Sequence, residues 1–112
     1  MKSSFELARG ATLPAGRAQV LTGRSWSGTS KIRSVAVSID RGATWHEAKL
    51  HGRNDAGTWV QWDYRFPAQP AGQYELWARA TDRTGRVQPA SVPFNENGYL
   101  YWGVARHPVT LQ

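Results

Sequence analysis

The sequence contains no cysteine and no long apolar run, and each absence excludes a class of protein. Without cysteine there is no disulfide framework, no thiolate metal site and no cysteine nucleophile. No stretch approaches the roughly 18 apolar residues of a membrane-spanning helix. Residues 1–9 carry charged side chains where a signal peptide has an apolar centre. We therefore expect a soluble chain with no membrane partner.

Acidic residues are also few. Eight Asp and Glu oppose fourteen Lys and Arg, which gives a formal charge of +6 and an isoelectric point near 10.3. Eleven of the basic residues are Arg, spread from Arg9 to Arg106 without a run. Proteins that bind nucleic acid usually gather basic residues on one face or in one arm. We therefore expect no nucleic-acid partner, because this pattern suits a protein interface or a small-anion site better.

Catalytic and metal-ligating patterns are scarce as well. His46, His51 and His107 show no close pairing that would indicate a metal site. Paired carboxylates could support hydrolysis, and the candidates are Asp40, Asp63, Asp82 and Glu96. Most of these stand in turns, where Asp commonly caps backbone amides. We therefore expect this chain alone to have no catalytic residue, no bound cofactor and no metal.

What the sequence does contain is typical of a β protein. Its 112 residues suit one domain, expected to span 1–112, and six Trp, four Tyr and three Phe supply a bulky core. Turn signals recur along the chain, and no segment keeps the helical period of about 3.6 residues. We predict an all-β, immunoglobulin-like sandwich of seven or eight short strands. The expected strands are 4–9, 17–26, 31–39, 44–50, 59–66, 73–81, 86–92 and 104–111.

Two of these strands carry sharper expectations. In 59–66, Val60, Trp62, Tyr64 and Phe66 alternate with polar residues and should face the core. The last strand contains Pro108, which cannot donate a ladder hydrogen bond, so we expect it at a sheet edge or a bulge. Residues 10–16 are interpreted as a turn-rich connection, since they contain two glycines and a proline.

A short motif lies between the third and fourth expected strands. Ser38, Asp40, Gly42, Thr44 and Trp45 form the pattern Ser-x-Asp-x-Gly-x-Thr-Trp. It resembles the Asp-box hairpin of sialidase-like propellers, in which the carboxylate satisfies turn amides and the Trp packs beneath it. A propeller repeats such a hairpin in each blade, whereas this chain has one copy. We therefore assign the motif a structural role in a lone hairpin, in preference to catalysis by Asp40.

A larger set of residues follows the order and spacing of one family. The set is Trp26-Ser27-Gly28, Ile32, the hairpin, Trp59, Trp62, Ala78-Arg79-Ala80-Thr81-Asp82, Gly85, Gln88-Pro89, Asn95 and Gly98-Tyr99. In these positions the chain resembles the C-terminal, immunoglobulin-like dimerisation domain of the sulfite oxidase family of molybdenum (molybdopterin) oxidoreductases. That family also includes plant-type nitrate reductases and sulfane dehydrogenases. The resemblance extends from about residue 19 to about residue 111.

The resemblance implies a larger parent enzyme. In this family a preceding catalytic domain holds a molybdopterin cofactor, and a cysteine of that domain ligates the molybdenum. This chain has no cysteine, so it is expected to be cut from such an enzyme or encoded separately. The implied partners are that catalytic domain and a second copy in a homodimer. The implied work is to hold two protomers together and to flank the active-site approach, in the periplasm if the parent is a bacterial sulfite oxidase.

The candidate dimer interface lies on the strand 73–81. Trp77 and Arg79 occupy the face opposite its apolar residues, and interface cores favour Trp and Arg. For Arg79 alone, a structural pairing with Asp63 or Glu75 across the sheet is favoured over contact with a partner. A candidate substrate-channel loop is formed by Asn97, Gly98 and Tyr99. In animal-type sulfite oxidases an Arg that contacts the substrate oxyanion stands where Asn97 stands here, so the resemblance implies that this contact is missing or supplied elsewhere.

The alternative function is a carbohydrate-binding module. Its sugar-stacking platform would be drawn from the aromatic residues Trp59, Trp62, Trp77, Tyr99, Tyr101 and Trp102. Aromatic side chains of a small β-sandwich more commonly fill its core. We therefore prefer the dimerisation domain to the carbohydrate-binding module.

Overall fold

The computed structural model of the chain describes residues 1–89 and 103–112. All regular structure in this part of the chain is β, which confirms the predicted fold class. The strands are β1 (Lys2–Phe5), β2 (Ala11–Leu13), β3 (Gln19–Trp26), β4 (Ile32–Ser38), β5 (His46–Glu47), β6 (Lys49–His51), β7 (Trp59–Phe66), β8 (Gly72–Asp82) and β9 (Ala105–Leu111).

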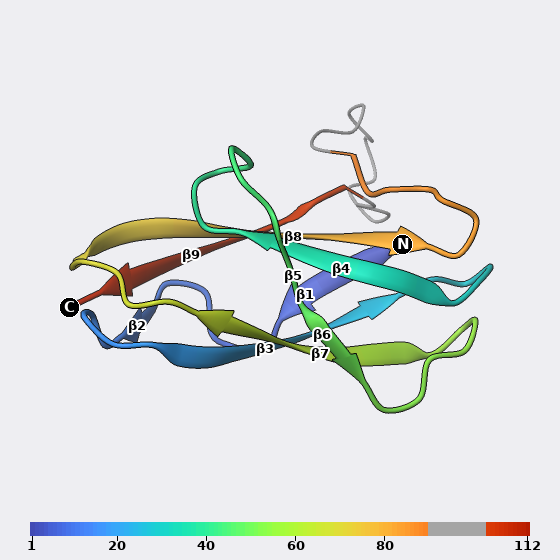
Figure 1. Ribbon diagram of the computed structural model, residues 1–112, viewed down its shortest axis with the longest axis horizontal. Helices are drawn as coiled ribbons and strands as arrows, with labels where there is room; N and C mark the ends of the chain where they lie inside the picture. The colour runs from blue at the N-terminus through green and yellow to red at the C-terminus, as the bar shows by residue number, and fades with distance from the viewer. Residues whose placement is uncertain (90–102) are drawn as a thin grey trace.

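These strands form two sheets that face each other. The four-stranded sheet has the order β1-β3-β7-β6, and the five-stranded sheet has the order β2-β9-β8-β4-β5. Neighbouring strands are antiparallel except β2 and β9, which run parallel. Figure 1 shows the sandwich from its edge, with β8 and β4 in the upper layer and β3 and β7 in the lower. The arrangement is the predicted β-sandwich.

The core lies between the two sheets and is built by alternation along the strands. On β7, Val60, Trp62 and Phe66 have no exposed surface and Tyr64 is 6% exposed, as the sequence predicts. Trp62 lies against the backbone of Gly23 on the neighbouring strand. A Cβ at Gly23 would be 2.2 Å from the indole ring. Only glycine therefore leaves room for the largest buried side chain.

One expected strand is divided between the two sheets. The segment 44–50 forms β5, which pairs with β4, and then β6, which pairs with β7. Ala48 marks the crossing point: it is buried, and its amide donates to the Val35 carbonyl at 2.8 Å. Prediction of a single strand was wrong here, because the alternating pattern does not record which sheet a strand joins.

The ends of the chain also differ from the expectations. Residues 11–13, expected in a connection, form β2 and pair with residues 109–111 of β9. Consequently β9 lies between β2 and β8, and the edge position predicted for it is wrong. Pro108 is tolerated because pairing with β2 begins one residue later, and its carbonyl accepts from the Gly10 amide at 2.9 Å. Of the expected strand 86–92, the described part makes one isolated bridge, between Thr81 and Val87.

A buried amide connects the two sheets near the chain start. The Gln88 side chain accepts a hydrogen bond from Ser3 Oγ at 2.7 Å and donates to the Gly103 carbonyl at 2.9 Å. The hydroxyls of Ser3 and Ser25 lie 2.8 Å apart, and Trp62 Nε1 donates to Ser25 Oγ at 3.1 Å. Because Ser3 gives its proton to Gln88, Ser25 must donate to Ser3. The hydrogen bonds therefore run in one direction, from β7 through β3 and β1 to Gln88.

Candidate functional site

The outer face of the five-stranded sheet carries the candidate interface residues. Along β8, Leu76, Ala78 and Ala80 are fully buried in the core. Trp77 and Arg79 alternate with them, are half-buried and lie on the opposite side of the sheet. The strand thus presents an aromatic ring and a guanidinium outward at a spacing of two residues.

Four side chains contact one another in a row on this face, and we call them the Trp–Arg cluster: Trp45, Trp77, Arg79 and Arg106. The guanidinium carbon of Arg79 lies 4.0 Å from the centre of the Trp45 ring. The Trp45 and Trp77 rings are 6.4 Å apart and inclined by 54°. Arg106, on β9, lies over Trp77 at 4.4 Å. Two cation–π contacts therefore flank an aromatic pair, and each fixes an Arg side chain against a ring.

The hairpin between β4 and β5 supplies Trp45 to the cluster. Asp40 accepts hydrogen bonds from Ser38 Oγ at 2.7 Å, the Thr44 amide at 2.8 Å and Thr44 Oγ1 at 2.5 Å. Ser38 Oγ in turn accepts from the Gly42 amide at 2.8 Å. These bonds, the Thr44 hydroxyl first, then the Thr44 amide and the Ser38 hydroxyl, lower the pKa of Asp40 to about 2. The carboxylate therefore closes the turn through these hydrogen bonds.

Gly42 brings the hairpin into contact with the sheet. It has a φ of 86°, and a Cβ there would lie 2.8 Å from the ring of Trp77. Glycine is required both by the positive φ and by the closeness of the ring. Trp45 does not join the core under the hairpin; it is half-buried on the outer face beside Trp77. The sequence motif gives no signal for this, since the partner ring lies 32 residues away (77 − 45).

The proposed pairing of Arg79 within the sheet is not found. Asp63 is on the other sheet and bonds His51 Nε2 at 3.1 Å. Glu75 accepts from Trp77 Nε1 at 2.7 Å. Among the described residues, neither carboxylate forms an ion pair with Arg79. Its guanidinium lies over the Trp45 ring instead.

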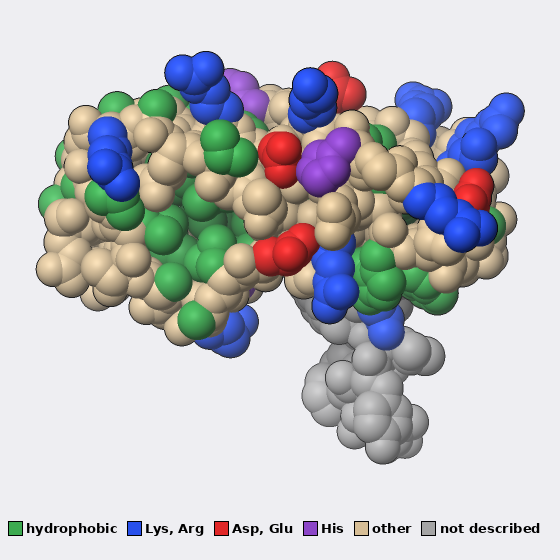
Figure 2. Space-filling model, turned by 90° about the horizontal axis from the view of Figure 1, so that it is seen from below, with side chains coloured by type: hydrophobic (Ala, Val, Ile, Leu, Met, Phe, Trp, Pro, Cys, Tyr) green, Lys and Arg blue, Asp and Glu red, His purple; other side chains and the backbone are tan. Residues whose placement is uncertain are grey.

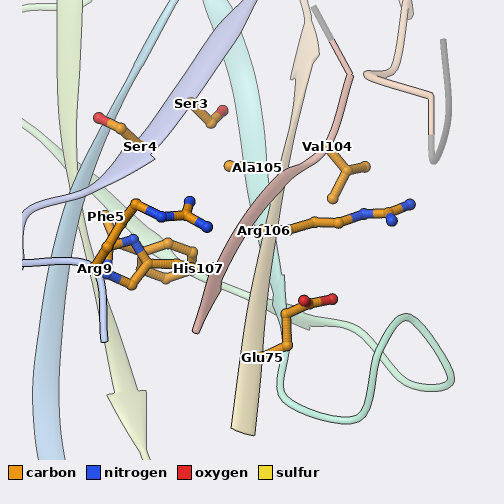
Figure 3. A pocket seen from close by; sticks show the side chains of 9 residues that line it. All are labelled: Ser3, Ser4, Phe5, Arg9, Glu75, Val104, Ala105, Arg106 and His107. Carbon is orange, nitrogen blue, oxygen red and sulfur yellow. The ribbon is translucent and has the colours of Figure 1, made fainter. Parts of the chain in front are cut away.

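A cleft of about 530 Å³ borders the cluster. Its lining residues are Ser3, Ser4, Phe5, Arg9, Glu75, Val104, Ala105, Arg106 and His107. In Figure 3 the Arg9 side chain extends into the cleft between β1 and β9, whereas Arg106 points away from Arg9. His107 Nε2 lies 2.8 Å from the Ala8 carbonyl. The two guanidinium groups do not converge, so the described residues that line the cleft lack the arrangement of a small-anion site.

The other outer face, on the four-stranded sheet, carries a second and smaller aromatic pair. Trp59 is 40% exposed, lies 6.5 Å from Trp26 and has Arg24 over its ring at 4.8 Å. Figure 2, viewed toward this sheet, shows Lys, Arg, Asp, Glu and His side chains mixed across the face and an apolar hollow beside them. Sequence reasoning did not single out Trp26 and Arg24 as surface residues. The sequence signal was that Arg24 and Trp26 flank Ser25 on β3, so that both lie on the face opposite to Ser25.

The described aromatic residues of the alternative sugar-stacking platform lie apart from one another. Trp62 is buried in the core, Trp59 lies on the outer face of one sheet and Trp77 on the outer face of the other. The remaining members, Tyr99, Tyr101 and Trp102, lie outside the described residues. So does the candidate substrate-channel loop, Asn97, Gly98 and Tyr99.

Within residues 1–89 and 103–112, no three His, Cys, Asp or Glu side chains gather where they could hold a metal ion. In the same ranges, no helix is long and apolar enough to cross a bilayer.

A family profile and several known proteins match the chain. The profile described as Mo-co oxidoreductase dimerisation domain matches residues 8–107. Sulfite oxidase from Gallus gallus is 35% identical over 88 residues, which cover 74% of this chain and 19% of that protein. The mitochondrial sulfite oxidase of Homo sapiens is 38% identical over 90 residues, which cover 74% and 16%. The chain thus spans less than a fifth of the length of these relatives.

Two solved structures share the fold. The sulfane dehydrogenase SoxCD from Paracoccus pantotrophus aligns with a TM-score of 0.72 and 24% identity, over 88% of this chain and 28% of that one. Fibronectin(III)-like modules of Clostridium thermocellum CbhA align with a TM-score of 0.60 and 15% identity, over 98% and 94%. At these identities the likeness concerns the sandwich architecture alone.

Proposed function

The chain belongs to the family of Mo-co oxidoreductase dimerisation domains, and from this membership we propose that it joins two protomers of a sulfite oxidase-like molybdenum enzyme. Its relatives are several times longer than the chain itself. Their remaining length leaves room for a catalytic domain, which is the second partner. The chain also flanks the approach to the active site, a role that rests on the resemblance of Gly98 and Tyr99 to the family.

The residues of this chain do not fit the molybdenum cofactor itself. The sequence has no cysteine to ligate the metal. The described residues hold no group of three metal-ligating side chains. The cofactor is therefore assigned to the catalytic domain of the parent. The dimerisation domain formed by this chain contributes contacts and shape, with no chemical step.

The Trp–Arg cluster is the observation that best supports a self-association face. Interface cores are enriched in Trp, Tyr and Arg and depleted in Lys and Glu. Here two Trp and two Arg contact one another on one sheet face. Two copies related by a two-fold axis would present the same cluster to each other. We propose that Trp77 and Arg79 lie at the centre of this contact.

Sedimentation of the purified domain from about 1 µM to about 1 mM tests this proposal. A micromolar dimer, equivalent to about 8 kcal/mol, is expected to dissociate on dilution. Trp77→Ala combined with Arg79→Ala should leave a monomer at concentrations where the wild type is dimeric. The matched control is Trp59→Ala with Arg24→Ala, which removes the same residue types from the other sheet. It should dimerise like the wild type.

Each contrary outcome has a separate meaning. A wild-type domain that stays monomeric at about 1 mM would overturn self-association by this domain. Loss of the dimer in the control variant alone would show that the interface lies on the four-stranded sheet. Binding of polysaccharides by the wild type, lost on Trp59→Ala, would instead favour the carbohydrate-binding alternative.

A further inference from the structure

The hairpin closed by Asp40 touches the Trp–Arg cluster at two separate points. The backbone of Gly42 lies against the ring of Trp77. Trp45 lies between Trp77 and Arg79, with ring-to-ring and ring-to-guanidinium distances of 6.4 and 4.0 Å. The hairpin projects beyond the outer face of the five-stranded sheet (Figure 1). A second copy that docks on this face must therefore meet the hairpin as well.

These contacts restrict how the Trp77 ring can turn. Its Nε1 donates to Glu75 at 2.7 Å, which fixes one edge of the indole. Gly42 and Trp45 lie against it from the hairpin, and Arg106 lies over it from β9. A half-buried Trp would otherwise sample several rotamers, and binding would have to immobilise it.

Arg79 is restricted in a similar way. Its guanidinium carbon lies 4.0 Å from the centre of the Trp45 ring, a cation–π contact that limits the positions the group can take. Without Trp45, the long side chain would regain rotamer freedom that ordering at an interface would remove again. Trp45 therefore limits the positions from which Arg79 can meet a partner.

We propose that the hairpin is a positioning element of the self-association face, with Gly42 and Trp45 as the residues that hold Trp77 and Arg79 ready for a second copy of the chain. This rests on the proposed dimerisation and adds a binding role to a motif that the sequence assigns to structure alone. The hairpin stays closed because the Asp40 carboxylate is bonded on both sides of the turn.

The test compares two glycines that share a backbone conformation and differ in their surroundings. Gly42 has a φ of 86° and would place a Cβ 2.8 Å from Trp77, whereas Gly52 has a φ of 78° and nothing within 4 Å. Replacement of either by alanine introduces the same kind of backbone strain. Only Gly42→Ala displaces the Trp77 ring. Dimer dissociation constants are measured by sedimentation, and the near-ultraviolet circular dichroism of the tryptophans reports their arrangement.

We expect Gly42→Ala to weaken the dimer by about tenfold or more and to change the tryptophan signal, as for a residue that shapes an interface centre. Gly52→Ala should change the dissociation constant by less than about twofold, as for a position away from the contact. Equal effects of the two substitutions, or an unchanged constant for Gly42→Ala, would overturn the positioning role while leaving dimerisation intact. A monomeric wild type would overturn both.

Should Gly42→Ala fail to fold, Trp45→Leu decides the matter. Leucine keeps an apolar side chain over the sheet and removes the ring that holds Arg79. Weakening of the dimer in a folded Trp45→Leu variant supports the inference. A folded variant that dimerises as tightly as the wild type contradicts it.

Discussion

At the scale of single residues, Asp82 shows how one carboxylate can close a turn from inside the protein. It is fully buried and accepts hydrogen bonds from the Thr84 hydroxyl at 2.6 Å, the Thr84 amide at 2.9 Å and the Arg86 amide at 3.0 Å. Arg86 Nε adds an ion pair at 3.2 Å. These contacts, the Thr84 hydroxyl first, lower the pKa of Asp82 from 3.8 to about 2.

This shift gives a pH dependence with a defined sign. The folded state releases its proton more readily than the unfolded state, so Asp82 stabilises the fold above pH about 4 and this contribution is lost as the pH falls through about 2. The free energy of unfolding should therefore fall between these pH values. The fall should be shallower in Asp82→Asn, as measured by urea denaturation at a series of pH values. A slope of equal steepness in the variant would contradict the assignment.

At the scale of elements, Gln88 connects strands that are far apart in the chain. Its side chain accepts from Ser3 on β1 and from the Ala80 amide on β8, and donates to the Gly103 carbonyl next to β9. The side chain is 2% exposed, so water cannot replace these bonds. A substitution there leaves several buried polar groups without a partner.

We expect Gln88→Leu to lower the free energy of unfolding by about 3 kcal/mol or more, because each orphaned buried group costs about 1–3 kcal/mol. The control is Gln19→Leu, since Gln19 is half-buried and donates one hydrogen bond, to the Pro14 carbonyl at 2.9 Å. Loss of that bond should cost about 1 kcal/mol. Similar midpoints for the two variants in chemical denaturation would show that the Gln88 network contributes little.

At the scale of the whole molecule, the two outer faces of the sandwich differ in what they can bind. The five-stranded sheet carries the Trp–Arg cluster with the hairpin standing beside it. The four-stranded sheet carries one smaller aromatic pair among mixed charges. Under the proposed dimerisation, the first face would receive a second copy and the second would remain for other contacts.

Self-association should be visible in thermal stability. A ligand that binds only the folded state raises the midpoint of unfolding with its concentration, and a second copy acts as such a ligand. The melting temperature of the domain should therefore rise between about 10 µM and about 1 mM protein, concentrations at which a dimer with a micromolar dissociation constant forms. Calorimetry of the Trp77→Ala, Arg79→Ala variant should show a melting temperature independent of concentration. A rise of the same size in that variant would place the dimer contact elsewhere.

The sequence by itself determined the β class, the core face of β7 and the place of Trp77 and Arg79 on the outer face of β8. Each of these follows from a local alternation of two residues, in which Val60, Trp62 and Phe66 or Leu76 and Ala78 point one way. The family resemblance could also be recognised in the sequence, because each of its motifs is a short stretch of the chain. Local alternation and short motifs can be recognised in a sequence without any knowledge of how the strands pair.

The tertiary structure alone decided which strands are neighbours and which surface residues meet. The exchange of sheets at Ala48, the parallel pairing of β2 with β9 and the contact of Gly42 with Trp77 all join segments whose separation in the chain carries no periodic signal. For the same reason Arg79 was expected beside a carboxylate and lies on Trp45 instead. Side-chain alternation fixes the face on which a residue lies, whereas its partner depends on strand order and register, which long-range packing selects.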